Sequence, residues 1–244
     1  MPSLSTADHR ASPPRVEIPR DYNAAHDLIE RNLVAGRAGK TAYIDDAGAY
    51  TYGELSERVN RCANALTTLG LLPEQRVLLC LLDGIDFPAV FLGAIKAGIV
   101  PIAANTLLTT NDYDYMLRDS RARALIVSAA LLPAFAPLLG KHPHLAHVIV
   151  SGAADEAAAP PHRSLASLMA AAPASFTPAE TTCDDACFWL YSSGSTGAPK
   201  GTVHLHSSLI QTAELYAKPI LGLREDDVVF SAAKLFFAYG LGNG

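Results

Sequence analysis

Apolar positions along the chain recur in two rhythms, which predict alternating strands and helices. A helix-like spacing ends at Gly70, a typical residue beyond a helix C-terminus, and involves Leu55, Val59, Cys62, Leu66 and Leu69. The run from Arg76 to Leu82 has no such period. It is typical of a strand that is buried on both faces of a parallel sheet.

The alternation continues to about residue 151 and indicates an α/β fold. Two β-prone runs, 41–44 and 50–52, flank a turn and predict a hairpin. The later segments are expected to be helices at 87–97, 111–119 and 131–139, and strands at 99–103, 124–128 and 147–151. Strands separated by helices predict βαβ units and mostly parallel sheets with flanking helices.

The segments between these elements predict that the chain is divided into three parts. Residues 1–22 contain prolines and no apolar run, so we expect a loose N-terminal arm. Residues 23–180 form a first α/β subdomain, and 181–244 start a second subdomain. The strand-like run 227–232 has no covering helix after it, so the chain is expected to be an incomplete domain that is truncated at Gly244.

The composition of the chain limits the kinds of molecule that it is expected to bind. The chain has 244 residues, of which 50% are apolar and 18% charged, and its net charge of −5 favours neither nucleic acid nor an anionic membrane. No apolar run reaches the roughly 20 residues of a membrane span. We therefore expect a cytoplasmic protein.

Two cysteines and two histidines late in the chain are of the types that bind metal ions, namely Cys183, Cys187, His204 and His206. Zinc is an alternative interpretation of this set, but no Cys-x-x-Cys pair supports it. The favoured interpretation is that these side chains are structural and that the chain holds no metal.

The segment from Tyr191 to Gly201 reads YSSGSTGAPKG and predicts a phosphate-binding loop between two strands. Glycines leave backbone N–H groups free to face an anion, hydroxyls add donors, and the lysine adds a mobile positive charge. The candidate phosphate-binding residues are Ser192, Ser193, Gly194, Ser195, Thr196, Gly197 and Lys200.

Other glycine motifs fit this segment poorly. A Walker A loop fails because Pro199 precedes Lys200 and Gly201 follows it. The Gly-x-Ser-x-Gly and Gly-x-Gly-x-x-Gly patterns are also absent. A flexible Ser/Gly linker is the remaining alternative, although a linker would not require the proline, the lysine or the flanking strands.

These eleven residues resemble the signature loop of the adenylate-forming (AMP-binding) superfamily, which includes acyl- and aryl-CoA ligases. Thr51–Leu55, Ala94–Gly98 and Lys234–Asn243 resemble three further motifs of that superfamily, in the same order. Within it, Phe236–Asn243 and Gly201–His206 are most similar to benzoate–CoA ligases and related aryl-acid ligases.

The resemblance implies an aromatic-acid pocket formed by Phe237, Ala238, Tyr239 and Gly240, with the small alanine leaving a flat slot. The alternative is that these aromatic side chains only fill a core. His204 and His206 alternate with apolar residues and are interpreted as structural histidines, not as acid–base catalysts.

The resemblance also implies a reaction. ATP with Mg²⁺ activates a benzoate-like carboxylate to an acyl-adenylate, and coenzyme A then takes the acyl group, with Lys200 as the catalytic residue for pyrophosphate departure. The later part of such an enzyme carries the adenine, ribose and metal sites and a C-terminal domain. This chain is therefore expected to be inactive alone. A ligase for a hydroxybenzoate, an aminobenzoate or a fatty acid, and a non-catalytic nucleotide-binding fragment, stay open as alternatives.

Overall fold

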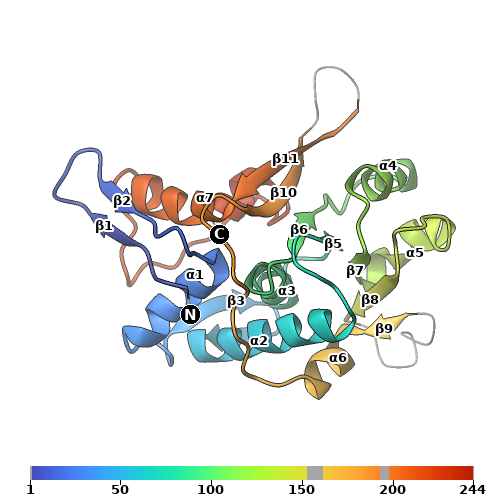
Figure 1. Cartoon of the computed structure of the whole chain (residues 1–244), viewed down its shortest axis with the longest axis horizontal. Helices are drawn as coiled ribbons and strands as arrows, with labels where there is room; N and C mark the ends of the chain where they lie inside the picture. Colours follow the sequence, from blue (N-terminus) through green and yellow to red (C-terminus); the bar gives the residue numbers. More distant parts are fainter. Residues whose placement is uncertain (1, 153–161, 193–197, 244) are drawn as a thin grey trace.

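A seven-stranded sheet forms the centre of the molecule (Figure 1). The structure is a computed structural model that describes residues 2–152, 162–192 and 198–243. The strand order is β11-β10-β6-β5-β7-β8-β9. The strands are β5 (Arg76–Cys80), β6 (Val100–Ala103), β7 (Ala124–Ser128), β8 (His147–Ser151), β9 (Arg163–Ser164), β10 (Ala186–Ser192) and β11 (Lys200–Leu205). All neighbours are parallel except β10 and β11, which confirms the predicted fold class.

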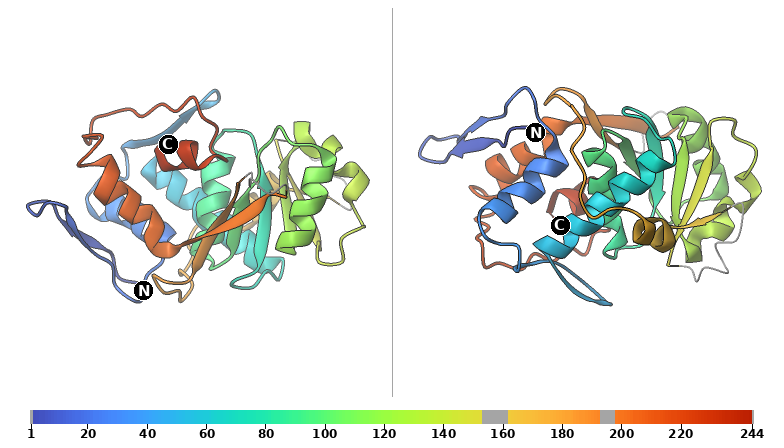
Figure 2. Two further views of the ribbon diagram at one scale, coloured as in Figure 1. Left: turned by 90° about the horizontal axis from the view of Figure 1, so that it is seen from above. Right: turned by 60° about the horizontal axis from the view of Figure 1, so that its bottom comes forward.

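Helices cover both faces of this sheet (Figure 2). Their bounds are α1 (Ala24–Val34), α2 (Tyr52–Thr68), α3 (Asp86–Lys96), α4 (Thr110–Ser120), α5 (Leu132–Phe135), α6 (Leu165–Ala171), α7 (His206–Thr212) and α8 (Ala238–Asn243). Val77 and Leu79 of β5 belong to a core that also includes residues of α1, α2, α3, α6 and α7, whereas Leu78 and Cys80 belong to a core with residues of α4 and α5. Successive strand residues thus bury opposite faces, as the unbroken apolar run predicted.

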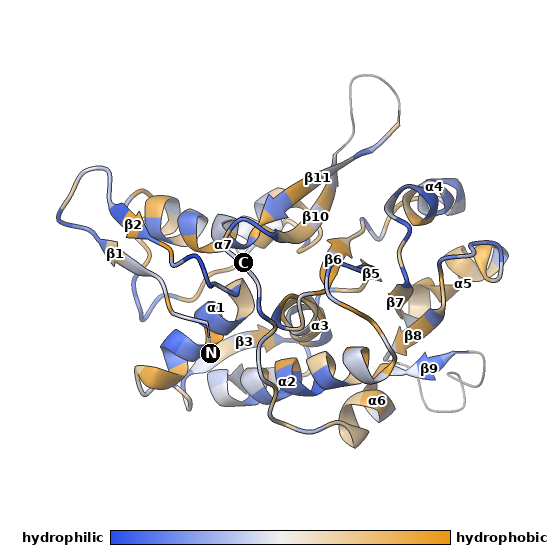
Figure 3. Ribbon diagram, in the orientation of Figure 1, coloured by the Kyte–Doolittle hydropathy of each residue, from blue (hydrophilic) through white to orange (hydrophobic). Residues whose placement is uncertain are grey.

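Hydrophobic colour in Figure 3 follows the same layering, with apolar residues on the central strands and polar ones on the outer sides of α2 and α4. Two of these helices begin at strong local signals. Thr51 caps α2 and forms a capping box with Glu54, and Thr109 does the same for α4 with Asp112. Within the described ranges, no helix combines the length and the apolar character that crossing a bilayer requires.

Two predicted elements differ from the structure. The helix expected at 131–139 is broken into 3₁₀ turns at Ala129–Leu131 and Ala136–Leu138 around the four residues of α5. Pro133 and Pro137 each remove an N–H donor and prevent a continuous helix. The run 227–232 forms no strand, and Val228 and Phe230 are 80% and 89% exposed. No neighbouring strand lies beside it to complete a hydrogen-bonded ladder among the described residues.

The predicted hairpin near residue 45 is confirmed as β3 (Thr41–Asp45) paired with β4 (Gly48–Thr51). A second hairpin, β1 (Thr6–Asp8) with β2 (Arg15–Glu17), lies in the segment expected to be a loose arm. The seven-stranded sheet contains strands from both sides of residue 180. The division into an arm and two subdomains stays a prediction.

Two buried carboxylates tie the N-terminal segment to the rest of the fold. Asp27 is fully buried and accepts hydrogen bonds from the hydroxyls of Ser5 and Tyr22, at 2.6 and 2.7 Å. Glu214 is in a π-helical turn, Ala213–Ala217, and accepts from His9 at 2.7 Å. Arg31 joins the two carboxylates, at 2.8 Å from Asp27 and 3.2 Å from Glu214. A buried charge is tolerated only with such partners.

Two helices approach each other closely where α3 crosses α2. Gly93 of α3 faces Cys62 of α2, and a Cβ atom built on Gly93 would lie 2.8 Å from the Cβ of Cys62 and 3.0 Å from the carbonyl oxygen of Val59. No side chain can occupy this position unless the two helices separate.

Gly93→Ala is therefore expected to lower the free energy of unfolding by about 1–3 kcal/mol, as overpacking of a core typically does. Chemical denaturation monitored by circular dichroism measures the change. Gly39→Ala is the matched control, because nothing lies within 4 Å of its added Cβ atom. Equal stability of the two variants would contradict the tight crossing of α2 and α3.

A second tertiary link joins the start of α1 to α7. The backbone N–H of Ala24 donates to Nδ1 of His206 at 3.0 Å, so this nitrogen must be unprotonated. His206 is only 1% exposed. Burial lowers the pKa of His206 from 6.5 to about 4, against an opposing effect of the Asp185 charge.

This link predicts a specific loss of stability in acid. Between pH 6.5 and 4 the unfolded chain binds a proton at His206 that the folded protein does not, whereas above pH 6.5 neither state is protonated. The free energy of unfolding should therefore fall by about 3 kcal/mol as the pH drops through this window.

His206→Asn retains an acceptor near the position of Nδ1 but cannot titrate, so this variant should lose that component of the acid sensitivity. The same substitution at the exposed His144 is the control. Denaturation curves from pH 4 to 8 measure both. Unchanged pH dependence in His206→Asn would show that His206 does not couple protonation to folding.

Candidate functional site

The two strands that flank the predicted phosphate loop form an antiparallel hairpin at one edge of the sheet (Figure 1). β10 enters the loop and β11 leaves it, with Ser192 opposite Lys200 and Tyr191 opposite Gly201. This is the strand–loop–strand layout that the sequence predicted. The predicted phosphate contacts Ser193, Gly194, Ser195, Thr196 and Gly197 lie outside the described residues.

Both described ends of the loop are accessible to a ligand. Ser192 and Lys200 are exposed, and they are brought side by side by the register of the hairpin. Lys200 forms no ion pair with any residue that the structure describes. A free ammonium group beside a hydroxyl is suited to an anion such as a phosphate, because both groups can donate hydrogen bonds to it.

The segment predicted as an acid pocket has both buried and exposed side chains. Phe236 is 5% exposed and belongs to the main core, whereas the next aromatic side chains, Phe237 and Tyr239, are 46% and 70% exposed. Gly240 is buried, and a Cβ atom there would clash with the carbonyl oxygen of Lys234. Only a glycine fits at this point of α8.

Ala238, the first residue of α8, lines an apolar pocket of about 280 Å³. Its other walls come from β10, β11, α1, α7, the π-helical turn and the 221–229 segment, and include Phe188, Leu190, His204 and Leu209. Phe237, Tyr239 and Gly240 do not line it. The structure therefore brings Ala238 to a cavity but does not gather the four predicted pocket residues around it.

The four residues weighed as a metal site do not come together. His204 stacks on Phe188, with ring centroids 4.5 Å apart, and His206 accepts from Ala24. Cys187 is buried, which raises the pKa of its thiol well above the usual value. No group of three or more His, Cys, Asp or Glu side chains is placed to hold a metal ion in the described part of the chain.

Sequence reasoning did not find the side chain that anchors the hairpin. The hydroxyl of Tyr191 donates to the carboxylate of Asp119 on α4 at 2.6 Å, across 72 residues of sequence. No local pattern marks Asp119, because the contact exists only once α4 packs beside β10.

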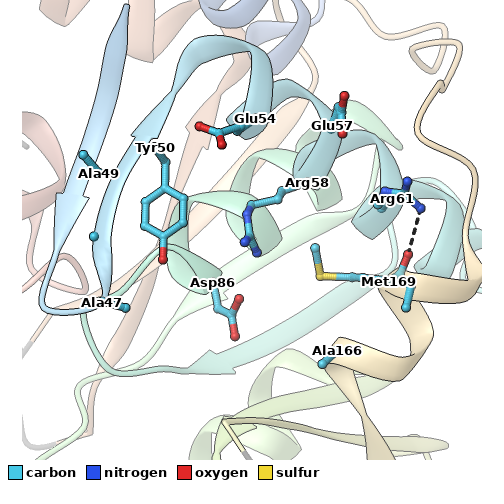
Figure 4. Close-up of a pocket in the computed structure, with 12 residues that line it drawn as sticks. Ala47, Ala49, Tyr50, Glu54, Glu57, Arg58, Arg61, Asp86, Ala166 and Met169 are labelled. Carbon is cyan, nitrogen blue, oxygen red and sulfur yellow. Dashed lines mark hydrogen bonds between the residues drawn. The ribbon is translucent and has the colours of Figure 1, made fainter. Parts of the chain in front are cut away.

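A separate groove of about 470 Å³ lies between the β3–β4 hairpin, α2 and α6 (Figure 4). Arg58 points into it and lies over the ring of Tyr50 at 5.1 Å from the ring centroid. Arg61 is engaged with the carbonyl oxygen of Ala172 at 2.6 Å, and Asp86 accepts from Ser151 at 2.6 Å. None of the predicted site residues lines this groove.

Comparison with known proteins identifies the family of the chain. The family described as "AMP-binding enzyme" matches residues 30–244. A benzoate–CoA ligase of Thauera aromatica is 68% identical over 245 residues, which cover 100% of this chain and 45% of that protein.

Two solved structures share the fold. A benzoate–CoA ligase from Burkholderia xenovorans LB400 has a TM-score of 0.82 at 54% identity, over 91% of this chain and 42% of its own. An anthranilate–CoA ligase in complex with anthranoyl-AMP has a TM-score of 0.88 at 38% identity, over 93% and 43%.

The chain thus spans less than half the length of these three relatives. Its signature loop lies between β10 and β11 of a sheet that matches theirs. On the match across residues 30–244, the chain belongs to the family of AMP-binding enzymes.

Proposed function

We propose that this chain is the N-terminal part of an enzyme that uses ATP to convert an aromatic carboxylate, of the benzoate type, to its coenzyme A thioester. The 68% identity to a benzoate–CoA ligase across the whole chain carries this proposal. The exposed pair of Ser192 and Lys200 at the hairpin supports the use of ATP.

The reaction proceeds in two steps. A carboxylate oxygen attacks the α-phosphorus of ATP, and the bond between this phosphorus and the oxygen that bridges it to the β-phosphorus breaks. Pyrophosphate departs with that oxygen, and the acyl-adenylate is formed. The thiol sulfur of coenzyme A then attacks the acyl carbon, loses its proton and releases AMP. Lys200 and the serine hydroxyls stabilise the negative charge that develops on the departing pyrophosphate.

Positioning and electrostatics are the contributions of this part of the enzyme. The loop residues Ser192 to Gly197 and Lys200 would hold the β- and γ-phosphates, with no covalent enzyme intermediate. Mg²⁺ would arrive with ATP as a charge-neutralising partner of the phosphates, and no described residue is assigned to it. The adenine, ribose and coenzyme A sites belong to other parts of the complete enzyme.

The acid is proposed to bind near the start of α8, beside Ala238, and Phe237, Tyr239 and Gly240 are proposed to complete its pocket in the whole enzyme. Ala238 already lines an apolar cavity, which suits a flat aromatic ring. The anthranilate–CoA ligase favours a second candidate function, the activation of an aminobenzoate in the same way. A cytoplasmic location is part of the same proposal.

The direct test is pyrophosphate exchange into ATP by the complete enzyme, with benzoate, hydroxybenzoates, aminobenzoates and a fatty acid as substrates. The 244-residue chain alone is expected to be inactive. Exchange that depends on benzoate supports the primary proposal. If only a fatty acid supports exchange, the aromatic acid is ruled out as the substrate. If none of the acids supports exchange, the ligase activity is ruled out.

Lys200→Ala in the complete enzyme should slow adenylation about 30- to 150-fold, because it removes about 2–3 kcal/mol of charge-assisted stabilisation of pyrophosphate. Benzoate-dependent pyrophosphate exchange measures this effect. Lys141→Ala, at an exposed position after the 3₁₀ turn at Ala136–Leu138, is the control and should exchange at the normal rate. A normal rate in Lys200→Ala would remove this lysine from the phosphate site.

Ala238→Leu should raise the KM for benzoate about tenfold or more, since added methylenes fill the apolar pocket. The KM for ATP should stay close to that of the unmodified enzyme. Ala232→Leu is the matched control, because Ala232 lies a few residues earlier and does not line the pocket. An equal rise in both KM values would place Ala238 outside the acid pocket.

A further inference from the structure

The tip of the phosphate hairpin extends beyond its main-chain support. The parallel pairing of β10 with β6 covers only Trp189 and Leu190. Tyr191 and Ser192 pair with β11 alone, and in Figure 1 both strands project away from the rest of the sheet. The position of Ser192 and Lys200 therefore depends on whatever side chains hold this two-stranded projection.

One such contact comes from α4. The hydroxyl of Tyr191 donates to Oδ2 of Asp119 at 2.6 Å, a short bond to a charged acceptor. Burial of the phenol, reinforced by the Asp119 carboxylate, raises the pKa of Tyr191. The phenol therefore stays protonated, and remains the donor, throughout the neutral pH range.

A second contact involves Trp189, whose side chain lies on the same side of β10 as that of Tyr191. A Cβ atom on Gly201 would lie 3.1 Å from Cε3 of the Trp189 ring and 3.6 Å from Cε1 of Tyr191. The two rings thus cover β11 at Gly201. This explains the last glycine of the signature segment by packing, independently of any phosphate contact.

Arg76 joins this packing to the end of α4. Its guanidinium lies 6.0 Å from the centroid of the Trp189 ring, and its Nε donates to the carbonyl oxygen of Ser120 at 2.8 Å. Ser120 is the residue after Asp119 and the last residue of α4. The C-terminal end of α4 is thereby fixed beside the two rings that cover the hairpin.

We propose that Asp119 is a positioning residue for ATP: through Tyr191 it holds the hairpin tip so that Ser192 and Lys200 face the β- and γ-phosphates. This inference rests on the proposed function for the identity of the ligand. Asp119 is not among the proposed phosphate contacts, and α4 acts as the support against which the tip of the hairpin is held.

The anchoring is tested first without any activity assay. Trp189 is the chain's one tryptophan, so its fluorescence reports directly on the packing of the hairpin in the 244-residue protein. Asp119→Ala and Tyr191→Phe should shift the emission to longer wavelength and increase quenching by acrylamide. Asp119→Asn, which keeps an acceptor oxygen, should restore most of the normal spectrum.

Arg118→Ala is the matched control on the same helix, because Arg118 pairs with Asp114 at 2.9 Å and not with the hairpin. Emission that is the same in Asp119→Ala, Arg118→Ala and the unmodified chain would overturn the anchoring.

The positioning role is tested in the complete enzyme. Asp119→Ala should raise the KM for ATP about tenfold, the equivalent of about 1.4 kcal/mol, and leave the KM for the acid unchanged. In a Lys200→Ala background the same substitution should have a smaller further effect, since one of the two groups that it positions is gone. A lower Tm without a change in the KM for ATP, or an equal rise in both KM values, would overturn the proposal.

The two proposals can fail separately. If no acid supports pyrophosphate exchange, the proposed ligase activity fails. The emission of Trp189 and the equilibrium dissociation constant of ATP then decide the role of Asp119. A dissociation constant for ATP that is raised in Asp119→Ala and normal in Asp119→Asn supports the positioning role of Asp119. Equal values in all variants reject it.

Discussion

Burial of the central strands on both faces is the constraint on which the fold depends. β5, β6 and β7 carry apolar side chains at nearly every position, so each face of the sheet must be covered by helices. The helices are accordingly divided between the two faces, and the tight crossing at Gly93 brings α3 close to α2. This layer is the base from which the β10–β11 hairpin projects (Figure 1).

The tip of this hairpin is joined to that base by fewer interactions than its start, where Cys187, Phe188 and Leu190 belong to the main core. Two residues of β10 pair with β6, and side chains of α4 supply the remaining support on one face. On the opposite face, Phe188 stacks on His204 beside the pocket that Ala238 lines. Such an arrangement suits the proposed phosphate site, because its flanking strands are held in register while Ser192 and Lys200 stay exposed.

Buried charged side chains connect the N-terminal segment to the rest of the fold. Asp27, Glu214 and Arg31 connect the first residues of the chain, α1 and the π-helical turn after α7. The turn also contributes Ala213 and Ala217 to the wall of the apolar pocket. The N-terminal segment is thus linked through side chains to one wall of the pocket proposed for the acid.

The sequence alone determined the fold class, most of the elements and the family, because these depend on local periodicity and on a contiguous motif. It also placed Ser192 and Lys200 in one candidate phosphate-binding loop between two strands, and the register of the hairpin then set them opposite each other. The pattern of apolar residues predicted a continuous helix at 131–139 and a strand at 227–232, and both predictions were wrong. The helix is broken, and the β-prone run 227–232 lacks a partner strand among the described residues.

Three contacts depend on the tertiary structure alone. Asp119 meets Tyr191 across 72 residues, Arg76 meets Trp189 across 113 residues, and His206 meets Ala24 across 182 residues. Such contacts leave no trace in any window of sequence, because packing of the helices against the sheet brings the partners together.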